Sequence, residues 1–264
     1  MSMRSNDKGF SHILILIVLV VLATVGFAVY RIASSDKKNN PESTQQSAKS
    51  GSQDSSGAEK DLKLQNIGID NIDNIDITTN AVREYGDKGL KGFYVFGDKL
   101  GGKDDVRKNP NFEYSSLKPG TKVISAIDGK VTFIKEQTDS GDREVFIQPK
   151  DGSVWIIGYD HLVNVKVKKD DNVKAGDIIG EPGIQNNGLR RFEIQINKEE
   201  NGSTTHYCPS VLLDSSVKDS VLASLLKMQN NWETTTGLDL YSVESQNPVG
   251  CVVKTMTLKE AEGN

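Results

Sequence analysis

The feature that most constrains this chain is a run of short, alternating apolar and polar stretches between Thr121 and residue 197. Alternation with a period of two is typical of half-buried β-strands, and breaks that contain Gly or Asp are typical of hairpins. The break at Asp128–Gly129 predicts one hairpin, and the break "KDGS" at 150–153 predicts another. The pattern therefore predicts a mainly β fold, built as an antiparallel sandwich or small barrel. The stretches that carry it are TKVISAI, KVTFIKE, EVFIQP, VWIIGY and FEIQI.

The size and charge of the chain limit its class. Its 264 residues allow one large or two small domains, and its formal net charge is −4. Nucleic-acid-binding domains usually carry a basic patch and a high pI. A slightly acidic chain without a Lys/Arg run in its folded part is therefore not expected to bind nucleic acid.

The N-terminal segment Ile13–Tyr30 is apolar over 18 residues without a charge. About 20 such residues span the hydrocarbon core of a bilayer as a helix. A cleaved signal peptide is the alternative, but its apolar region runs about 7–15 residues and ends at a small-residue cleavage site. We predict a retained transmembrane signal anchor at 13–30, which makes the chain a single-pass protein of the cell membrane.

Two further questions about this segment stay open. Lysines and arginines lie on both sides of it, so the positive-inside rule does not determine its orientation. We expect residues 1–12 in the cytoplasm and the C-terminal domain outside it. The stretch KGFSHILIL also resembles a prepilin cleavage signal, but Leu14 stands where pilins carry a Glu.

The rest of the chain outside the β pattern divides into three segments. Residues 31–60 are rich in Ser, Gln and charge without apolar periodicity, which predicts a disordered linker. Residues 61–108 include "IDNIDNID" and a Gly-rich part, which predict an irregular lead-in. The tail at 208–264 contains a predicted helix at 214–233, with an N-cap at 214–216. The apolar stripe of this helix is Val221, Leu222, Leu225 and Met228.

The two cysteines, Cys208 and Cys251, lie on either side of the predicted helix. Their spacing is not that of a zinc ribbon. In an extracytoplasmic domain a disulfide between them would tie the helical tail to the sheet. We favour this disulfide over the alternative of two free, buried thiols.

Several of the β stretches occur in an order that resembles one family. They are similar to the landmarks of the lysostaphin/LytM-type zinc metallopeptidases. In chain order, the stretches are PGTKVISAIDGKVTFI, GYDHL, VKVKKDDNVKAGDIIGEPG and FEIQI. The match covers roughly residues 109–197, within an expected β domain at 109–207. It implies a compact β core of the duplicated hybrid motif type with an open groove. In active members the groove holds one zinc ion that cuts peptide crosslinks in peptidoglycan.

The resemblance implies three zinc ligands: a His, an Asp four residues later, and the second His of a His-x-His element before Phe-Glu. In this sequence Asn109, Glu113 and Arg191 stand at those positions. The assisting histidine of the Tyr-x-His-Leu element is kept as His161, and Leu189 stands where the other assisting histidine is implied. Arginine has no lone pair for a metal. We therefore expect no catalytic residues, no zinc and no other cofactor, with a family position kept only at His161.

Alternation along the last strand divides the neighbours of Arg191 between two faces. One face is expected to look into the groove, and it carries Leu189, Arg191, Glu193 and Gln195. The opposite face is expected to look into the core, and it carries Arg190, Phe192, Ile194 and Ile196.

Arg191 would then face Glu113, and we predict a bidentate ion pair between them, with a solvated Arg191 as the alternative. Arg190 conflicts with its expected core position, because a buried unpaired cation is costly. Either it reaches out to solvent, or the strand begins later, or the alignment is shifted by one residue.

The other histidines offer few alternatives. His12 belongs to the apolar N-terminal segment, and His206 is expected at the surface unless the tail folds over the groove. His161 has a structural alternative too, because without a metal it would simply cap a turn or hydrogen-bond to a carbonyl.

The combined features predict a membrane-anchored, extracytoplasmic cell-wall protein with a catalytically inactive peptidase-like domain. Its expected partners are peptidoglycan or a cell-wall hydrolase that it regulates, and the membrane through the N-terminal helix. The alternatives are an active zinc endopeptidase with an atypical ligand set, and a carrier or adhesion module that shares only the β architecture. The Met-Lys pair of a carrier hairpin is missing, which counts against a carrier.

Overall fold

The computed structural model describes residues 61–78, 81–82, 89–100 and 104–263. The predicted cytoplasmic segment, signal anchor and linker, which together make up residues 1–60, lie outside this part of the chain. Within the part that is described, no helix combines the length and the apolar character needed to cross a bilayer.

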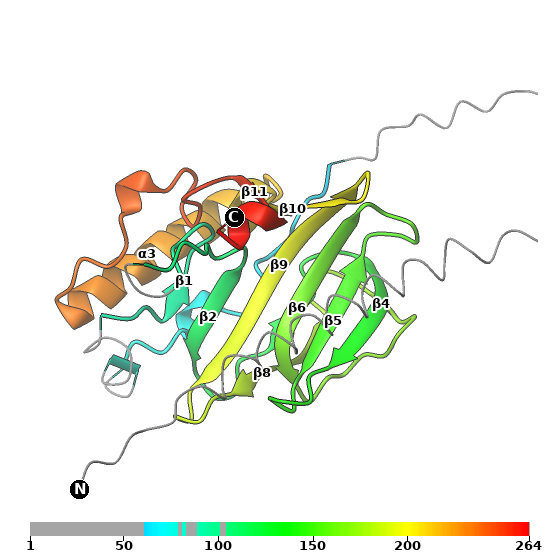
Figure 1. The fold of residues 1–264 in the computed structure, drawn as a ribbon. Helices are drawn as coiled ribbons and strands as arrows, with labels where there is room; N and C mark the ends of the chain where they lie inside the picture. Colours follow the sequence, from blue (N-terminus) through cyan, green and yellow to red (C-terminus); the bar gives the residue numbers. More distant parts are fainter. Residues whose placement is uncertain (1–60, 79–80, 83–88, 101–103, 264) are drawn as a thin grey trace, which may run out of the picture. The chain divides into compact units, whose positions relative to one another are not determined.

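The described part is mainly β, as the sequence predicts (Figure 1). Eleven strands form one sheet in the order β1-β2-β9-β8-β6-β5-β4-β7, with β3, β10 and β11 attached to its sides. All pairings between these strands are antiparallel. The strands are β1 (Phe93–Tyr94), β2 (Phe112–Leu117), β3 (Val123–Ile124), β4 (Gly129–Glu136), β5 (Arg143–Gln148), β6 (Trp155–Val163), β7 (Asn172–Val173), β8 (Ile178–Ile184), β9 (Arg190–Glu200), β10 (Ser203–Tyr207) and β11 (Thr255–Thr257).

Strand β9 is the organising element of the sheet, because it pairs with β2, β6, β8 and β10. Phe192, Ile194 and Ile196 are fully buried on one of its faces. The register that alternation predicts for this strand is therefore confirmed. Strands β2 and β6 flank the central part of β9, so the side chains on its opposite face meet those of both neighbours.

One predicted hairpin is confirmed and the other is wrong. Strands β5 and β6 pair through the "KDGS" turn as expected. The stretch before Asp128–Gly129 does not pair with β4. Its short strand β3 pairs with β8, which lies far along the chain, and β4 pairs with β5 and β7. Val123 is buried, and its strand partner on β8 is Gly180. A local turn signal carries no information about such a long-range pairing.

Most of the segment 61–78 has no regular secondary structure, and it forms part of the core. Leu64, Ile67 and Ile69 are buried in the main hydrophobic cluster. The hydroxyl of Tyr114 donates a hydrogen bond of 3.0 Å to the carbonyl oxygen of Ile67. Gly68 has φ +87°, and a Cβ there would lie 2.8 Å from the ring of Phe192. Close packing against the sheet thus requires glycine at this position.

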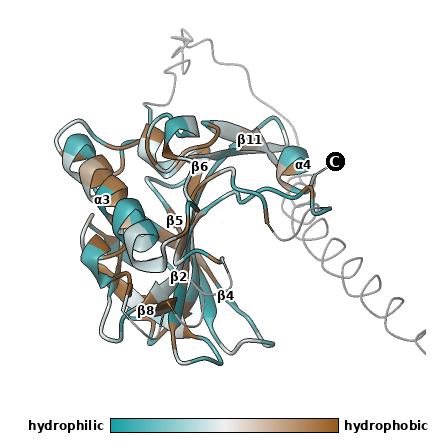
Figure 2. Ribbon diagram, turned by 90° about the vertical axis from the view of Figure 1, so that its left-hand side faces the viewer, coloured by the Kyte–Doolittle hydropathy of each residue, from teal (hydrophilic) through white to brown (hydrophobic). Residues whose placement is uncertain are grey.

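The predicted tail helix is present as α3 (Lys218–Thr236), and it starts four residues later than its sequence signals indicate. Asp214 and Ser216 bond to each other in the preceding turn and do not cap the helix. Leu225, Met228 and Trp232 are buried. Figure 2 shows α3 at one side of the sheet, with apolar and polar segments alternating along it.

The remaining tail elements are short. They are α4 (Leu258–Ala261) and two 3-10 helices, Pro209–Val211 and Val243–Ser245; a third 3-10 helix lies earlier, at Ile72–Asn74. Cys208 and Cys251 are joined by a disulfide, with their Cα atoms 5.9 Å apart. This bond ties the segment before α3 to the segment after it.

Candidate functional site

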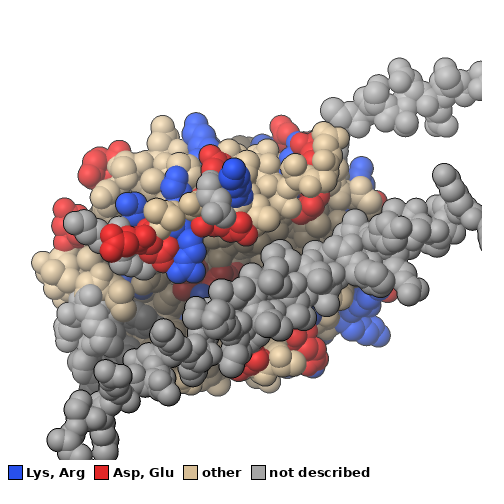
Figure 3. Space-filling model, viewed as in Figure 1, with Lys and Arg blue, Asp and Glu red and all other residues tan. Residues whose placement is uncertain are grey.

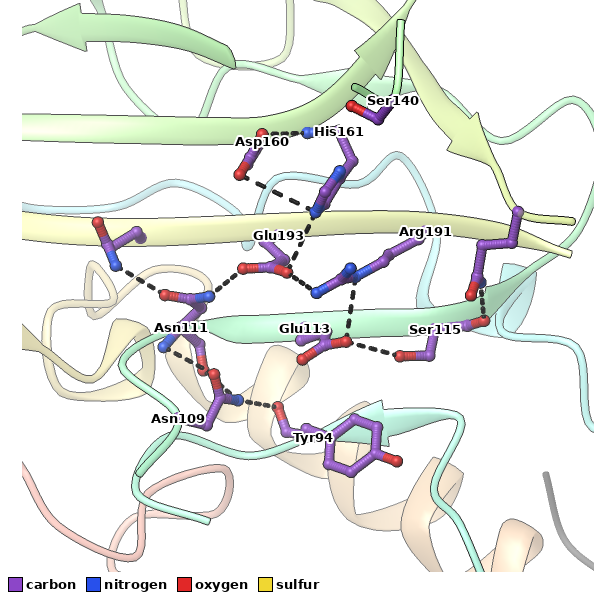
Figure 4. A network of polar contacts seen from close by, with 12 residues as sticks. Tyr94, Asn109, Asn111, Glu113, Ser115, Ser140, Asp160, His161, Arg191 and Glu193 are labelled. Carbon is purple, nitrogen blue, oxygen red and sulfur yellow. Dashed lines mark hydrogen bonds and ion pairs between the residues drawn. The ribbon is translucent and has the colours of Figure 1, made fainter. Parts of the chain in front are cut away.

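The polar face of the sheet carries a compact group of charged side chains (Figure 4). Glu113 on β2, Glu193 on β9 and Asp160 on β6 are direct neighbours across three strands. Arg191 lies two residues before Glu193 on the same face of β9. His161 lies near the end of β6. Strand pairing, and not sequence proximity, brings these groups together. Elsewhere on the surface, basic and acidic side chains are interspersed on the face that Figure 3 shows.

Arg191 lies between two carboxylates. Its Nε is 3.1 Å from Oε1 of Glu113, and its Nη2 donates a hydrogen bond to Oε1 of Glu193. The predicted contact with Glu113 is therefore present. The predicted bidentate geometry is wrong, because Nε is buried without a properly directed hydrogen bond. The guanidinium divides its contacts between Glu113 and Glu193.

His161 is fixed from both sides of its ring. Its Nδ1 lies 2.8 Å from Oδ2 of Asp142, and its Nε2 lies 3.4 Å from Oε1 of Glu193. Its backbone has φ 58°, a left-handed conformation that is uncommon for a residue with a side chain. The backbone N–H donates a hydrogen bond of 2.6 Å to Oδ1 of Asp160. Asp142 in turn accepts a hydrogen bond of 2.6 Å from the hydroxyl of Ser140.

The electrostatics of this group follow from burial and mutual contact. Burial disfavours the imidazolium of His161, but contact with Glu193 and the charge of Asp160 outweigh it and raise its pKa to about 9. Burial also works against ionised Glu193, yet His161 and Arg191 hold the pKa of Glu193 below its usual value. Burial and the neighbouring Glu193 charge raise the pKa of Glu113. Glu193 is thus the ionised partner that the two cations share.

Glu144 lies beside this group, and both its carboxyl group and that of Asp160 have raised pKa values. Burial, helped by the charge of Asp160, raises the pKa of Glu144 to about 7. Burial likewise raises the pKa of Asp160, against the opposing effect of His161. The contact from Glu144 to Lys135 is long, with Nζ and Oε2 3.7 Å apart. Carboxyl groups therefore outnumber the two cationic side chains, Arg191 and His161, on this face.

A chain of amide side chains runs from Glu193 along the sheet. Asn111 donates to Glu193, Gln195 donates to Asn111 at 2.8 Å, and Asn197 donates to Gln195 at 3.1 Å. His206 ends the chain, with Nδ1 2.8 Å from Oδ1 of Asn197. The expected surface position of His206 is wrong. This residue is buried because β10 lies between β9 and β11, and burial lowers the pKa of its imidazole.

Two of the six predicted groove residues do not join the charged group. Asn109 is buried, and its amide donates to the backbone carbonyl oxygens of Tyr94, Val95 and Asn111 at 3.3, 3.2 and 3.1 Å. Asn109 thus fixes the approach to β2. Leu189 precedes β9 in a turn and is buried in the hydrophobic cluster, because the alternation of the strand begins only at Arg190.

The structure shows why Arg190 is tolerated at a position that alternation assigns to the core face of β9. It is half-buried at the start of β9, and its Nη1 donates a hydrogen bond of 3.1 Å to the carbonyl oxygen of Pro182. A partnered, half-buried arginine is compatible with the predicted register. The core face of β9 begins at Phe192.

Sequence reasoning missed several members of the group. Asn111 has a readable signal, because it lies two residues before Glu113 and directly precedes β2, so alternation continued back from that strand places it on the face of Glu113. Asp160 precedes His161 directly, but only the bulged end of β6 brings both side chains to one face. Asp142 and Glu144 have no local signal, because they come from the β4–β5 hairpin and reach the site only through the pairing of β5 with β6.

The residues at the implied zinc positions do not fit a zinc ion. The Asn109 amide nitrogen donates to three backbone carbonyl oxygens, and the Glu113 carboxylate contacts the guanidinium of Arg191. Arg191 has no lone pair to donate, and its positive charge opposes a cation at this place. No catalytic step through zinc follows from this set of side chains.

The β domain is similar to known proteins. Residues 114–206 match the model of Peptidase family M23. The solved structure of LytU is 29% identical, covering 40% of this chain and 73% of that chain with a TM-score of 0.34. The catalytic domain of the antimicrobial peptidase lysostaphin from Staphylococcus simulans is 23% identical, covering 45% of this chain and 84% of that chain with a TM-score of 0.33. Csd3 of Helicobacter pylori is 18% identical, covering 70% of this chain and 45% of that chain with a TM-score of 0.39.

One curated relative is also similar. The β′ subunit of DNA-directed RNA polymerase from Natranaerobius thermophilus is 29% identical over 120 residues. The match covers 43% of this chain and only 9% of that subunit. The match over residues 114–206 confirms the predicted resemblance of this part of the chain to the lysostaphin/LytM-type metallopeptidases.

Proposed function

We propose that this protein binds peptidoglycan through the polar face of its M23-type domain without hydrolysing it. The observation that carries the proposal is the position of Arg191, which replaces an implied zinc-binding histidine and lies between Glu113 and Glu193. A guanidinium at this place supplies fixed positive charge and hydrogen-bond donors. It supplies neither a metal nor a metal-activated water. The groove can then bind peptidoglycan, but it lacks the metal-activated water that would hydrolyse a peptide crosslink.

The proposal includes the predicted placement of the chain. The apolar segment at 13–30 anchors the protein in the cell membrane, with residues 1–12 in the cytoplasm. The linker at 31–60 carries the lead-in at 61–108, the β domain at 109–207 and the tail at 208–264 away from the membrane. The Cys208–Cys251 disulfide supports an extracytoplasmic location, because disulfides persist mainly in oxidising compartments. The sandwich- or barrel-like closure of the core belongs to the same proposal.

One observation favours a second candidate, an active zinc endopeptidase with an atypical ligand set. Asp142, Asp160 and His161 offer ligand atoms that lie within 4.8 Å of one another. Against it, Nδ1 of His161 already contacts Asp142, and Nε2 faces Glu193 beside the Arg191 guanidinium. A dication here would have to displace these contacts. We therefore prefer the non-hydrolytic function.

A single preparation tests both candidates. The full chain, purified in detergent, is incubated with purified peptidoglycan, sedimented, and analysed in parallel for bound zinc and for released fragments. We expect co-sedimentation, zinc far below one equivalent, and no release of crosslink fragments. Stoichiometric zinc with chelator-sensitive cleavage would establish the endopeptidase instead. An Arg143→Met variant, which changes an exposed arginine outside the groove, is the matched control for nonspecific binding through surface charge.

A further inference from the structure

A cavity of about 700 Å³ opens at the end of the groove, beside Arg191. Its walls come from the end of β6, the end of β8, the turn between β8 and β9, and the β4–β5 hairpin. Arg191 and His161 both line it, whereas Glu113 and Glu193 do not. The two cationic side chains therefore face the open space, together with Asp142, the partner of His161, whereas the two carboxylates that contact Arg191 are not part of the lining.

Arg191 has one hydrogen-bonding arm left for this cavity. Its Nε and Nη2 face Glu113 and Glu193. Its Nη1 makes no hydrogen bond to another residue that the structure describes, and 36% of the side chain is exposed. The two carboxylates hold the guanidinium in place, so the free arm is pre-oriented. A pre-oriented donor loses little conformational entropy when a ligand binds.

The cavity also has an apolar wall. Ile184, at the end of β8, is 64% exposed although it is a large apolar residue. Val163, at the end of β6, lies on the same lining. Asn186 in the following turn is exposed and adds a polar amide at the rim. A donor at the base, an apolar wall and an amide at the rim suit a peptide backbone that carries small apolar side chains.

Charge decides to which kind of ligand oxygen Arg191 would donate a hydrogen bond. Glu113 and Glu193 offer two carboxylates to one guanidinium, and the carboxylate of Asp142 faces His161. A ligand carboxylate would meet this surplus of negative charge and be repelled. A peptide carbonyl oxygen accepts the same hydrogen bond without adding a full charge.

We propose that Arg191 binds the carbonyl oxygen of an internal peptide bond in a wall peptide, through Nη1, with Ile184 packing against the adjacent side chain. Arg191 is then a ligand-binding residue that determines specificity for neutral peptide backbone over a free terminal carboxylate. This inference rests on the proposed binding of peptidoglycan and names the part of it that is recognised.

The test uses the full chain in detergent and soluble muropeptides released from purified peptidoglycan by a muramidase. Titration calorimetry compares the wild-type chain with Arg191→Lys, which keeps a positive charge beside Glu113 and Glu193 but loses the free arm. A hydrogen bond to a charged group contributes about 1.5–3 kcal/mol, so the affinity is expected to fall by about tenfold or more. Arg190→Lys is the matched control, since Arg190 bonds to Pro182 outside the cavity, and its affinity is expected to equal that of the wild type.

Two further measurements keep the test decisive. Ile184→Ser removes the exposed apolar wall without touching the charged group, and it is expected to weaken binding by about threefold to tenfold. Muropeptides whose carboxylates have been converted to amides with carbodiimide and ammonia are expected to bind at least as tightly as untreated ones.

The outcomes separate the two proposals. A wild-type chain that binds no muropeptide contradicts the proposed function itself. If the wild type binds but Arg191→Lys and Ile184→Ser bind equally well, the inference about this cavity is wrong and the proposed function stands. A loss of binding on amidation of the muropeptides would also overturn it, because a carboxylate would then be the recognised group.

Discussion

Nε of Arg191 lies 3.1 Å from Oε1 of Glu113, across the pairing of β9 with β2. Glu193 contacts the other side of the same guanidinium and is the direct strand partner of Glu113. Two carboxylates that face each other across a strand pair would repel, and Arg191 removes that repulsion. The arginine is thus part of the reason why this sheet face is stable in its observed arrangement.

Replacing Arg191 with an uncharged residue of similar length should destabilise the fold. Arg191→Met leaves Glu113 and Glu193 without their shared cation, and we expect the free energy of unfolding to fall by about 1–3 kcal/mol at pH 7, a range reduced for the partial exposure of Arg191. Urea denaturation of residues 57–264 measures this. Adding Glu113→Gln should restore part of the loss. The exposed Arg143–Glu136 pair gives the control, since Arg143→Met should change stability by less than about 1 kcal/mol. Equal losses in the two single variants would contradict the role given to Arg191.

Glu144 should make the fold less stable as the pH rises. Its pKa is raised to about 7 in the folded state from 4.5, so the folded protein holds this proton more tightly than the unfolded chain does. Stability is therefore lost as the pH rises from about 4.5 through about 7. Glu144→Gln should raise the free energy of unfolding by about 1–3 kcal/mol at pH 8 and leave it nearly unchanged at pH 4.

The measurement for Glu144 is a pair of urea denaturation curves at each pH. Glu136→Gln serves as the matched control, because Glu136 lies on the same hairpin with a strongly exposed side chain. A stabilisation of the Glu144→Gln protein that is the same at pH 4 and pH 8 would show that loss of the buried charge is not its cause.

His161 should stay protonated well above neutral pH. Its pKa is raised to about 9, with Glu193, Asp160 and Asp142 overcoming the effect of burial. The stability that this shift contributes is fully present below about 6.5 and is lost as the pH rises through about 9. A proton NMR titration of the His161 ring should give a midpoint near 9, and Asp142→Asn should move it downward. Buried His206, whose pKa is lowered, provides an internal reference, and a His161 midpoint near 6.5 would contradict the network.

The Cys208–Cys251 disulfide should stabilise the tail against the sheet. The two residues are 43 positions apart in the sequence, and a crosslink that closes a loop of this size contributes about 2–5 kcal/mol to stability. The double variant Cys208→Ala/Cys251→Ala should lower the free energy of unfolding by that amount. Denaturation of the wild type with and without reductant gives an independent measurement. A reductant effect that persists in the double variant would point to a cause other than this bond.

The sequence by itself determined the local properties of the fold. The period of two in FEIQI placed Phe192, Ile194 and Ile196 in the core, and "KDGS" gave a true hairpin. The motif order around His161 and Glu193 predicted the resemblance that the family match over residues 114–206 confirms. The absence of a metal-binding side chain at Arg191 was also readable, because the chemistry of a guanidinium does not depend on its surroundings.

Only the tertiary structure decided which groups meet. A hairpin that pairs with β6 brings Asp142 to His161 and Glu144 near Asp160, and β3 takes its partner from β8 and not from its neighbour β4. Leu189 and Asn109 leave the groove because burial and backbone carbonyls hold them elsewhere. Contacts between distant strands are fixed by how the whole core packs, and no stretch of sequence contains that information on its own.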